Sequence, residues 1–261
     1  MSPARFDAWF QSDAGNGVDP PGTLGPLAAA AGLAGFALAD AGAVAGLAAA
    51  AAGAEAAGVA FLPGVALEAE ADGSAVAVFG FGIDPASERL AGVLTAAAEA
   101  DRRHRAATAE RLAGVGVRLP EGAEPGPAAL VAAGYAPSRH AARRRYFARG
   151  GVAWVPREPT PAVEAVAAVV AAGGTVALRP GAGLSDPAEA ERLEHAAARL
   201  RAAGLRAFLV ASVAERTARA PLAGRQGLAV LGGSGHRGAG RGPEPGEAWT
   251  DAAAWARLGG A

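Results

Sequence analysis

Cysteine and lysine are both absent from this chain of 261 residues. Without a thiol, the chain can form no disulfide, no thiolate metal site and no cysteine nucleophile. All 24 basic residues are therefore arginine, and 25 acidic residues leave a formal net charge of −1. A total charge near zero argues against a general nucleic-acid binder, because the phosphate backbone selects strongly basic proteins. We expect no nucleic-acid partner.

Long apolar segments of the kind that target or cross membranes are also missing. Residues 1–13 contain no apolar run long enough for a signal peptide. Residues 27–66 carry few charges, but Asp40 and Glu55 interrupt them and Pro63 falls near their end. We expect no membrane partner and, by default, a cytoplasmic location.

Short apolar runs alternate with alanine-rich segments of helical length, which is typical of an α/β fold. Asp72-Gly73 between two apolar runs predicts a β-hairpin. Residues 85–150 have only helical patterns, and this predicts a helical insert. The other predicted helices span 24–33, 43–56, 161–172, 187–203 and 249–258, and the strands include 35–38, 59–67, 76–81, 175–178, 206–210 and 228–231. We predict one α/β domain over 1–261 with an insert at about 85–150.

Several short strings resemble, in the same order, strings of the polymerase-and-histidinol-phosphatase (PHP) phosphoesterases. They are Pro63-Gly64-Val65 (a "PGVE" strand end), Phe81-Gly82-Ile83-Asp84-Pro85 (after the hairpin), Leu130 to Tyr135 (the insert helix), Ala171 to Gly174 (before "AHP") and Gly232-Gly233-Ser234 ("GSDxHG"). The resemblance covers nearly the whole chain. It implies a distorted (β/α)7 PHP-like barrel with a helical insert, and in that family two or three divalent cations lie at the carboxyl ends of the strands.

The metal ligands of that family do not carry over to this sequence. Its initial His-x-His pair corresponds to Trp9 and Gln11. Its "TDHD" string retains only the first acid, Asp40, and the histidine corresponds to Ala41. The bridging glutamate corresponds to Ala66. The remaining ligand positions correspond to Ala77, Pro125, Arg179, Ser212, Gly235 and Arg237. We call these ten residues other than Asp40 the former ligand positions.

Clustered divalent cations repel one another and need several carboxylates and neutral imidazoles to hold them and to activate water. Alanine, glycine, proline and tryptophan side chains supply no such ligand. Arg179 has a permanent positive charge, which would repel a cation. We therefore predict no bound metal, no cofactor and no phosphoesterase turnover, which makes the chain a catalytically degenerate relative, or pseudoenzyme.

Four residues, Asp40, Arg179, His236 and Arg237, are the candidates for a pocket that binds a small anion such as phosphate at the former active site. Two simpler roles compete with this hypothesis: Asp40 as the N-cap of a helix, and Arg179 as the ion-pair partner of an acid such as Asp40. The other histidines are expected at the surface: His104, His140 and His195.

Two further functions fit the same sequence. A metal-independent or weakly metal-dependent hydrolase would use Asp40 as acid or base and Arg179 to bind an anionic substrate. Glu68 is two residues after Ala66 and on the same strand face, so it could in principle take the place of the bridging glutamate. It would still lack the histidine partners that the family's glutamate has. The second alternative is a structural subunit of a complex, whose protein partner the sequence does not identify.

Overall fold

The structure of the chain is a computed structural model that describes residues 3–181 and 187–259. Its contacts divide the chain into two compact units. The first contains Met1–Leu94 and Thr160–Ala261, and the second contains Thr95–Pro159. The second unit overlaps the predicted insert; the grouping of both units into a single domain stays a prediction.

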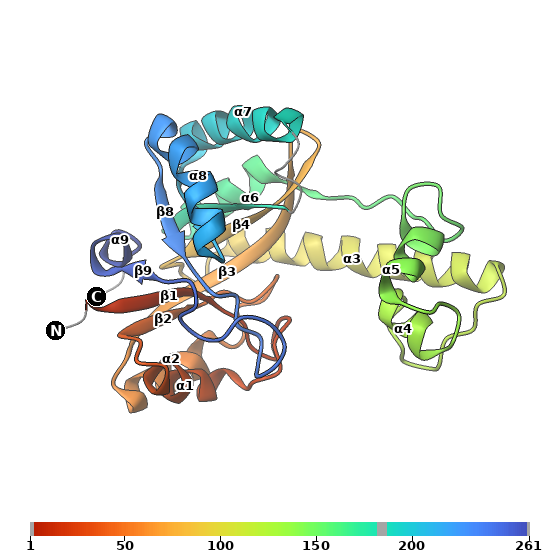
Figure 1. The fold of residues 1–261 in the computed structure, drawn as a ribbon, viewed down its shortest axis with the longest axis horizontal. Helices are drawn as coiled ribbons and strands as arrows, with labels where there is room; N and C mark the ends of the chain where they lie inside the picture. Colours follow the sequence, from red (N-terminus) through yellow and green to blue (C-terminus); the bar gives the residue numbers. More distant parts are fainter. Residues whose placement is uncertain (1–2, 182–186, 260–261) are drawn as a thin grey trace. The chain divides into compact units, whose positions relative to one another are not determined.

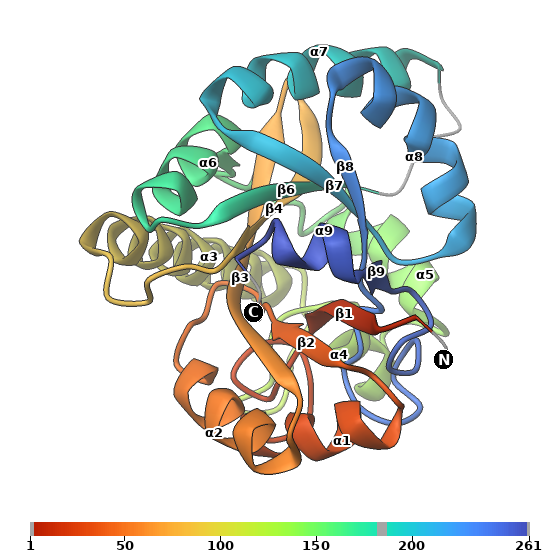
Figure 2. The same ribbon diagram turned by 90° about the vertical axis from the view of Figure 1, so that its left-hand side faces the viewer.

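The first unit is built on a sheet that curls into a nearly closed barrel (Figures 1 and 2). The strand order is β8-β7-β6-β4-β3-β2-β1-β9, and β5 pairs with β3. Neighbours pair in parallel except β3 with β4, β4 with β6, and β1 with β9. The strands are β1 (Arg5–Phe10), β2 (Gly35–Leu38), β3 (Ala60–Ala71), β4 (Ser74–Phe81), β5 (Thr160–Pro161), β6 (Thr175–Pro180), β7 (Leu205–Val210), β8 (Ala229–Gly232) and β9 (Thr250–Asp251). The predicted distorted barrel is confirmed.

Main-chain contacts close the barrel between β1 and the segment after β8. The Gln11 amide donates to the His236 carbonyl at 2.9 Å, and the Gly235 amide donates to the Trp9 carbonyl at 2.8 Å. Phe10 and His236 form an isolated parallel bridge. The segment 233–236 therefore extends the sheet beyond β8 and joins its two ends.

Helices cover the outer face of the barrel (Figure 2). Their alanine, valine and leucine side chains pack on the outward residues of the strands in one buried cluster. In α6, for example, Ala165, Val166 and Val169 are buried at helical spacing. The helices of this unit are the 3₁₀ turn η1 (Pro21–Thr23), α1 (Leu24–Ala30), α2 (Leu47–Ala57), α6 (Ala162–Ala171), α7 (Pro187–Ala203), α8 (Val213–Gln226) and α9 (Ala252–Ala256).

A second buried cluster fills the interior of the barrel. It combines small residues such as Ala37 and Ala177 with the aromatic rings of Phe79 and Phe81. At the amino-terminal end of β1, the Trp255 ring of α9 stacks on Phe6, with 4.7 Å between ring centroids. The helix α9 thus fills that end of the barrel. The former ligand positions of the first unit belong to the opposite end, where the parallel strands finish.

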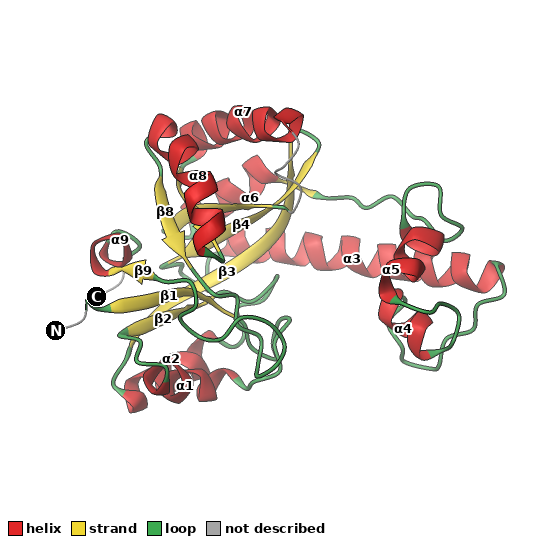
Figure 3. Cartoon of the chain, in the orientation of Figure 1, coloured by secondary structure: helices red, strands yellow, loops and turns green. Residues whose placement is uncertain are grey.

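The second unit consists of helices around a small apolar core (Figure 3). It contains the carboxyl-terminal part of α3 (Glu88–Gly114), α4 (Pro127–Ala132), α5 (Arg139–Ala142) and a π-helical turn, η2 (Arg143–Phe147). Leu112, Leu130 and Tyr146 are among its buried residues. Within the described residues, no helix has the length and apolar character that crossing a membrane requires.

Several predicted elements are confirmed and two are wrong. The hairpin turns at Asp72-Gly73, both with positive φ, and α7 has the predicted bounds. The sequence reading missed α8, whose interior Pro221 and many charges hide its apolar face. The helix predicted at 249–258 is shorter, because β9 precedes α9.

Candidate functional site

Nine of the ten former ligand positions lie in the first unit, on the side of the barrel where the parallel strands finish, here called the barrel mouth. Trp9 and Gln11 lie at the end of β1, and Ser212 follows β7. Ala41 and Ala66 form an isolated bridge. Ala77 of β4 pairs with Arg179 of β6, Gly235 and Arg237 follow β8, and Pro125 belongs to the second unit. Barrel enzymes carry out their chemistry at this end.

Arg179 and Trp9 contact each other at the mouth. The guanidinium carbon of Arg179 lies 5.1 Å from the centroid of the Trp9 ring, in the range of a cation–π interaction. The indole also meets Phe79 edge-on, with centroids 5.2 Å apart. Gly235 has φ +69°, and a Cβ there would come within 2.8 Å of the indole. The glycine therefore makes room for the tryptophan ring.

The first turn of α8 supplies the acid that pairs with Arg179. One Nη of Arg179 lies 3.3 Å from Oε1 of Glu215, while Oε2 accepts from the Ala211 amide at 2.8 Å. Ser212 is the N-cap of α8 and accepts from the Glu215 amide. Arg219, one turn further on, is buried, and this burial lowers its pKa although Glu215 opposes the shift. The mouth therefore has two guanidinium groups around one carboxylate.

Three of the former ligand positions have a buried donor without a hydrogen-bond partner. Within the described part of the chain they include Trp9 Nε1, Gln11 Nε2 and Arg179 Nε. Similar atoms occur elsewhere, on His104 and Trp255. A buried unpaired donor costs about 1–3 kcal/mol. Three such donors at former ligand positions form a set that suits a hydrogen-bond acceptor and repels a cation.

His236 and Arg237 do not join Arg179. The His236 ring is buried, lies 5.6 Å from the Phe10 ring, and places Nδ1 3.1 Å from the Pro243 carbonyl and Nε2 3.5 Å from Oδ2 of Asp19. Phe10 belongs to the outer apolar cluster, whereas Trp9 packs on the inner one. Arg237 is exposed. Among the histidines expected at the surface, His140 and His195 are exposed, but His104 is half-buried.

Asp40 has a structural role that differs from both interpretations of the sequence. It is buried, and its oxygens accept from the Ser12 amide at 2.6 Å and the Ser12 hydroxyl at 2.5 Å. Burial raises the pKa of Asp40, and Asp13 adds to the shift. The N-cap interpretation is wrong, because Gly46 precedes α2. The Arg179–Asp40 pair is also wrong, because Arg179 pairs with Glu215.

Asp40 therefore fixes the loop that follows β1. We expect Asp40→Ala to lower the free energy of unfolding by about 2–3 kcal/mol, since the buried Ser12 amide and hydroxyl lose their acceptor. Urea denaturation followed by circular dichroism measures this change. Asp13→Ala, at an exposed neighbour, should change stability by less than about 0.5 kcal/mol. Equal effects of the two substitutions would contradict the role.

Asp7 is the functional-site neighbour that the sequence reading missed. Its carboxylate is fully buried and accepts from the amides of Trp9 (3.0 Å), Ser234 (2.8 Å) and Gly246 (2.9 Å). Burial raises the pKa of Asp7 to about 6, although these hydrogen bonds act in the opposite direction. The signal in the sequence is an acid inside an apolar strand. Asp7 ties the loop after β8 to the strand that carries Trp9.

The residues at the mouth do not fit the divalent cations that the PHP resemblance implies. In the described ranges, no group of three or more histidine, cysteine, aspartate or glutamate side chains is arranged to hold a metal ion. Alanine or glycine stands at Ala41, Ala66, Ala77 and Gly235, and the guanidinium of Arg179 adds positive charge. These residues therefore do not supply the ligands that a cluster of divalent cations needs.

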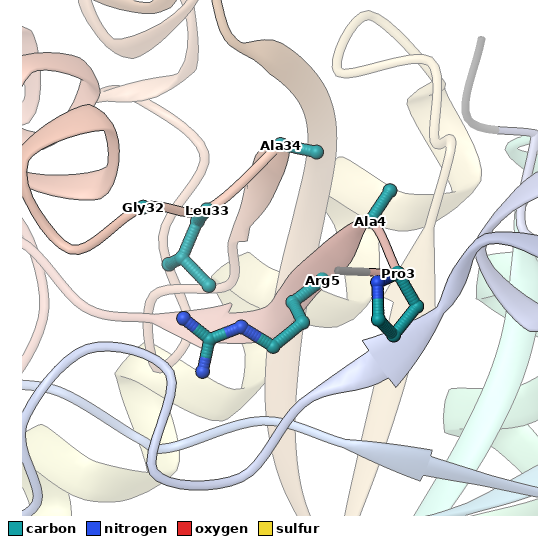
Figure 4. Close-up of a pocket in the computed structure, with 6 residues that line it drawn as sticks. All are labelled: Pro3, Ala4, Arg5, Gly32, Leu33 and Ala34. Atoms are coloured by element: carbon teal, nitrogen blue, oxygen red, sulfur yellow. The ribbon is translucent and has the colours of Figure 1, made fainter. Parts of the chain in front are cut away.

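Two cavities have no former ligand position in their lining. One, of about 670 Å³, is at the amino-terminal end of β1 and is lined by Pro3, Ala4, Arg5, Gly32, Leu33 and Ala34 (Figure 4). There a guanidinium nitrogen of Arg5 donates to the Ala31 carbonyl at 3.4 Å. The other, of about 480 Å³, lies between α7 and α8 and is lined in part by Arg219 and Arg225. The first is at the end of the barrel opposite the usual place of barrel chemistry.

Comparison with known proteins finds solved structures with the same fold. No protein-family model matches the chain, and a search of curated proteins found no match. Among solved structures, the chain is similar to an amidohydrolase from Chromobacterium violaceum with bound sulfate and no metal (27% identity, 98% of this chain and 96% of that chain, TM-score 0.82). It is also similar to a proposed metal-dependent phosphoesterase from Bifidobacterium adolescentis (24% identity, 98% and 96%, TM-score 0.79). The chain thus has the fold of hydrolases and phosphoesterases of this kind.

Proposed function

We propose that this chain is a catalytically degenerate PHP-like barrel whose mouth binds a small oxyanion, such as phosphate, in place of a metal cluster. The observation that carries the proposal is the position of Arg179. It stands where the family has a metal-binding histidine, lies over Trp9, and has a buried Nε without a partner. A guanidinium presents parallel N–H groups that match two oxygens of a phosphate or carboxylate.

The surrounding donors extend the same argument. Trp9 Nε1 and Gln11 Nε2 supply two further N–H groups at the end of β1. Glu215 competes with the ligand, because it already pairs with Arg179 at 3.3 Å. An anion that binds Arg179 replaces Glu215 as the partner of the guanidinium. Glu215 then still accepts a hydrogen bond from the Ala211 amide. The similar amidohydrolase has a bound sulfate, which supports an anion as a ligand of this fold.

Of the four candidate pocket residues, the contacts favour Arg179 as the anion ligand. His236 and Arg237 are assigned a smaller part, because the His236 ring contacts Phe10, Asp19 and Pro243, and Arg237 is exposed. We assign Asp40 no contact with the anion, because both of its oxygens accept from Ser12.

The metal-independent hydrolase has one observation in its favour, the raised pKa of Asp40, which is typical of acid–base residues. Asp40, however, is 2% exposed, and its two carboxylate oxygens accept from the Ser12 amide and the Ser12 hydroxyl. A general acid must reach its substrate. The pseudoenzyme therefore accounts better for Asp40.

Metal analysis and activity assays test the proposal together. After incubation with Mn²⁺ or Zn²⁺ and gel filtration, elemental analysis should find no stoichiometric metal on the purified chain. A chromogenic phosphomonoester should be hydrolysed no faster than in buffer, with or without these metals. Isothermal titration should detect phosphate binding. Stoichiometric metal accompanied by turnover would refute the proposal.

A further inference from the structure

The second compact unit has a charge very different from that of the rest of the chain. Thr95–Pro159 contains eleven arginines and six acidic residues, which give a net charge of +5. The rest of the chain contains thirteen arginines and nineteen acidic residues, which give −6. The net charge of −1 for the whole chain therefore hides a basic unit, and the expectation of no nucleic-acid partner rested on that total.

Four of the six acidic residues of the second unit form ion pairs within it. Four acids form ion pairs with four arginines: Glu99 with Arg102, Glu158 with Arg103, Asp101 with Arg105 and Arg157, and Glu124 with Arg105. No acid occurs in the sequence between Glu124 and Glu158. Among the described residues, the arginines of that interval other than Arg157 form no salt bridge with a carboxylate.

Five of these arginines lie in one short segment, Arg139–Arg149, which spans α5 and η2 and which we call the arginine segment. The side chains of all five, Arg139, Arg143, Arg144, Arg145 and Arg149, are exposed. Arg145 lies over the ring of Tyr146, 5.2 Å from its centroid. Across the described residues, none of the five forms a salt bridge with an acid. The segment thus has an outer face of unpaired positive charge.

The apolar residues of the arginine segment point the other way. Ala142 and Tyr146 are buried with Leu112 and Leu130, which lie on α3 and α4 (Figure 1). The outer face is left without an apolar band that would insert between lipid chains. A protein partner would also need an apolar centre to its interface. A polyanion needs neither.

We propose that the arginine segment binds nucleic acid through the phosphate backbone without reading sequence. Nine residues of helix span about 12 Å, which equals the length of roughly four nucleotides of one strand at about 3.4 Å each. Four of the arginines lie on these nine residues, Arg139–Phe147, and Arg149 follows two residues later, so the number of charges is close to the number of phosphates over that length. Phosphate contacts position a protein without specifying bases. The arginine segment shares no residue with the oxyanion site proposed at the barrel mouth.

Fluorescence anisotropy of a labelled single-stranded oligonucleotide, measured over a series of KCl concentrations, tests the proposal with the full chain. Each phosphate contact contributes about −0.7 to the slope of log K against log salt for a single strand. With four or five contacts, the wild-type slope should be about −3. The triple variant R143Q/R144Q/R145Q should lose about 2 from that slope and bind at least tenfold more weakly at low salt.

Matched variants separate local charge from total charge and from folding. R89Q/R241Q/R257Q removes three exposed arginines of the first unit and should leave the slope unchanged. R143K/R144K/R145K keeps the charge and should retain binding. R179Q should not change the affinity for the oligonucleotide. A failure of the proposal for the barrel mouth would therefore leave this test unaffected. Equal weakening by the two glutamine triples, no oligonucleotide binding by the wild type, or binding only to phosphatidylserine vesicles would each overturn the proposal.

Discussion

Arg179→Gln should weaken the binding of phosphate or sulfate ten- to a hundredfold. A hydrogen bond to a charged group contributes about 1.5–3 kcal/mol, and each 1.4 kcal/mol is a factor of ten in the dissociation constant. Glutamine keeps much of the side-chain length but removes the charge and the paired N–H groups. Isothermal titration of both proteins with phosphate measures the difference.

Arg237→Gln is the matched control for that prediction. It removes the same charge from an exposed residue that the sequence also assigned to the pocket. We expect a change of less than about twofold, because an exposed charge acts through screened solvent. A larger loss at Arg237 than at Arg179 would move the anion site to the loop after β8 and contradict the assignment to Arg179.

Asp7→Ala should lower the free energy of unfolding by about 3–5 kcal/mol at pH 5, because three main-chain amides lose their buried acceptor. The loss should be smaller at pH 8. Because burial raises the pKa of Asp7 from 3.8 to about 6, the folded chain binds this proton more tightly than the unfolded chain. The stabilisation it gives is complete below pH 3.8 and is lost as the pH rises through 6.

For the wild type, this difference in proton binding contributes on the order of 1 kcal/mol more stability at pH 5 than at pH 8. The measurement is urea denaturation of wild type and variant at several pH values, with the difference between them plotted against pH. Glu55→Ala, at an exposed acid, is the control, and its difference from wild type should stay flat. A difference for Asp7→Ala that grows with pH would contradict the sign of the shift.

The sequence predicted most of the barrel because its local signals agree with its tertiary packing. Asp72-Gly73 adopts the positive φ angles of a tight hairpin, and α7 begins and ends where its pattern does. The helix α8 was not predicted, because Pro221 and the charged residues obscure its apolar face, which includes the buried Leu222 and Ala223. Its absence from the prediction had a direct consequence, since α8 carries Glu215, the true partner of Arg179.

The site was predictable in its positions but not in its contacts. Strand ends placed Trp9 and Arg179 at the same end of the barrel, and they do meet there. The direction of a loop side chain depends on the path of the main chain. The sequence alone therefore could not show that the His236 side chain contacts Phe10 and Asp19 and does not join Arg179. Asp7 was overlooked because two of the amides that it binds, those of Ser234 and Gly246, lie more than 200 positions away in the sequence. Only the Trp9 amide is close to it in the chain.

The most direct test of the account is a crystal structure of the chain grown with both MnCl₂ and phosphate, with anomalous data collected at the manganese edge. The account predicts a tetrahedral anion on the guanidinium of Arg179 and no manganese peak at the barrel mouth. A manganese peak there, coordinated by side chains of the chain, would contradict it.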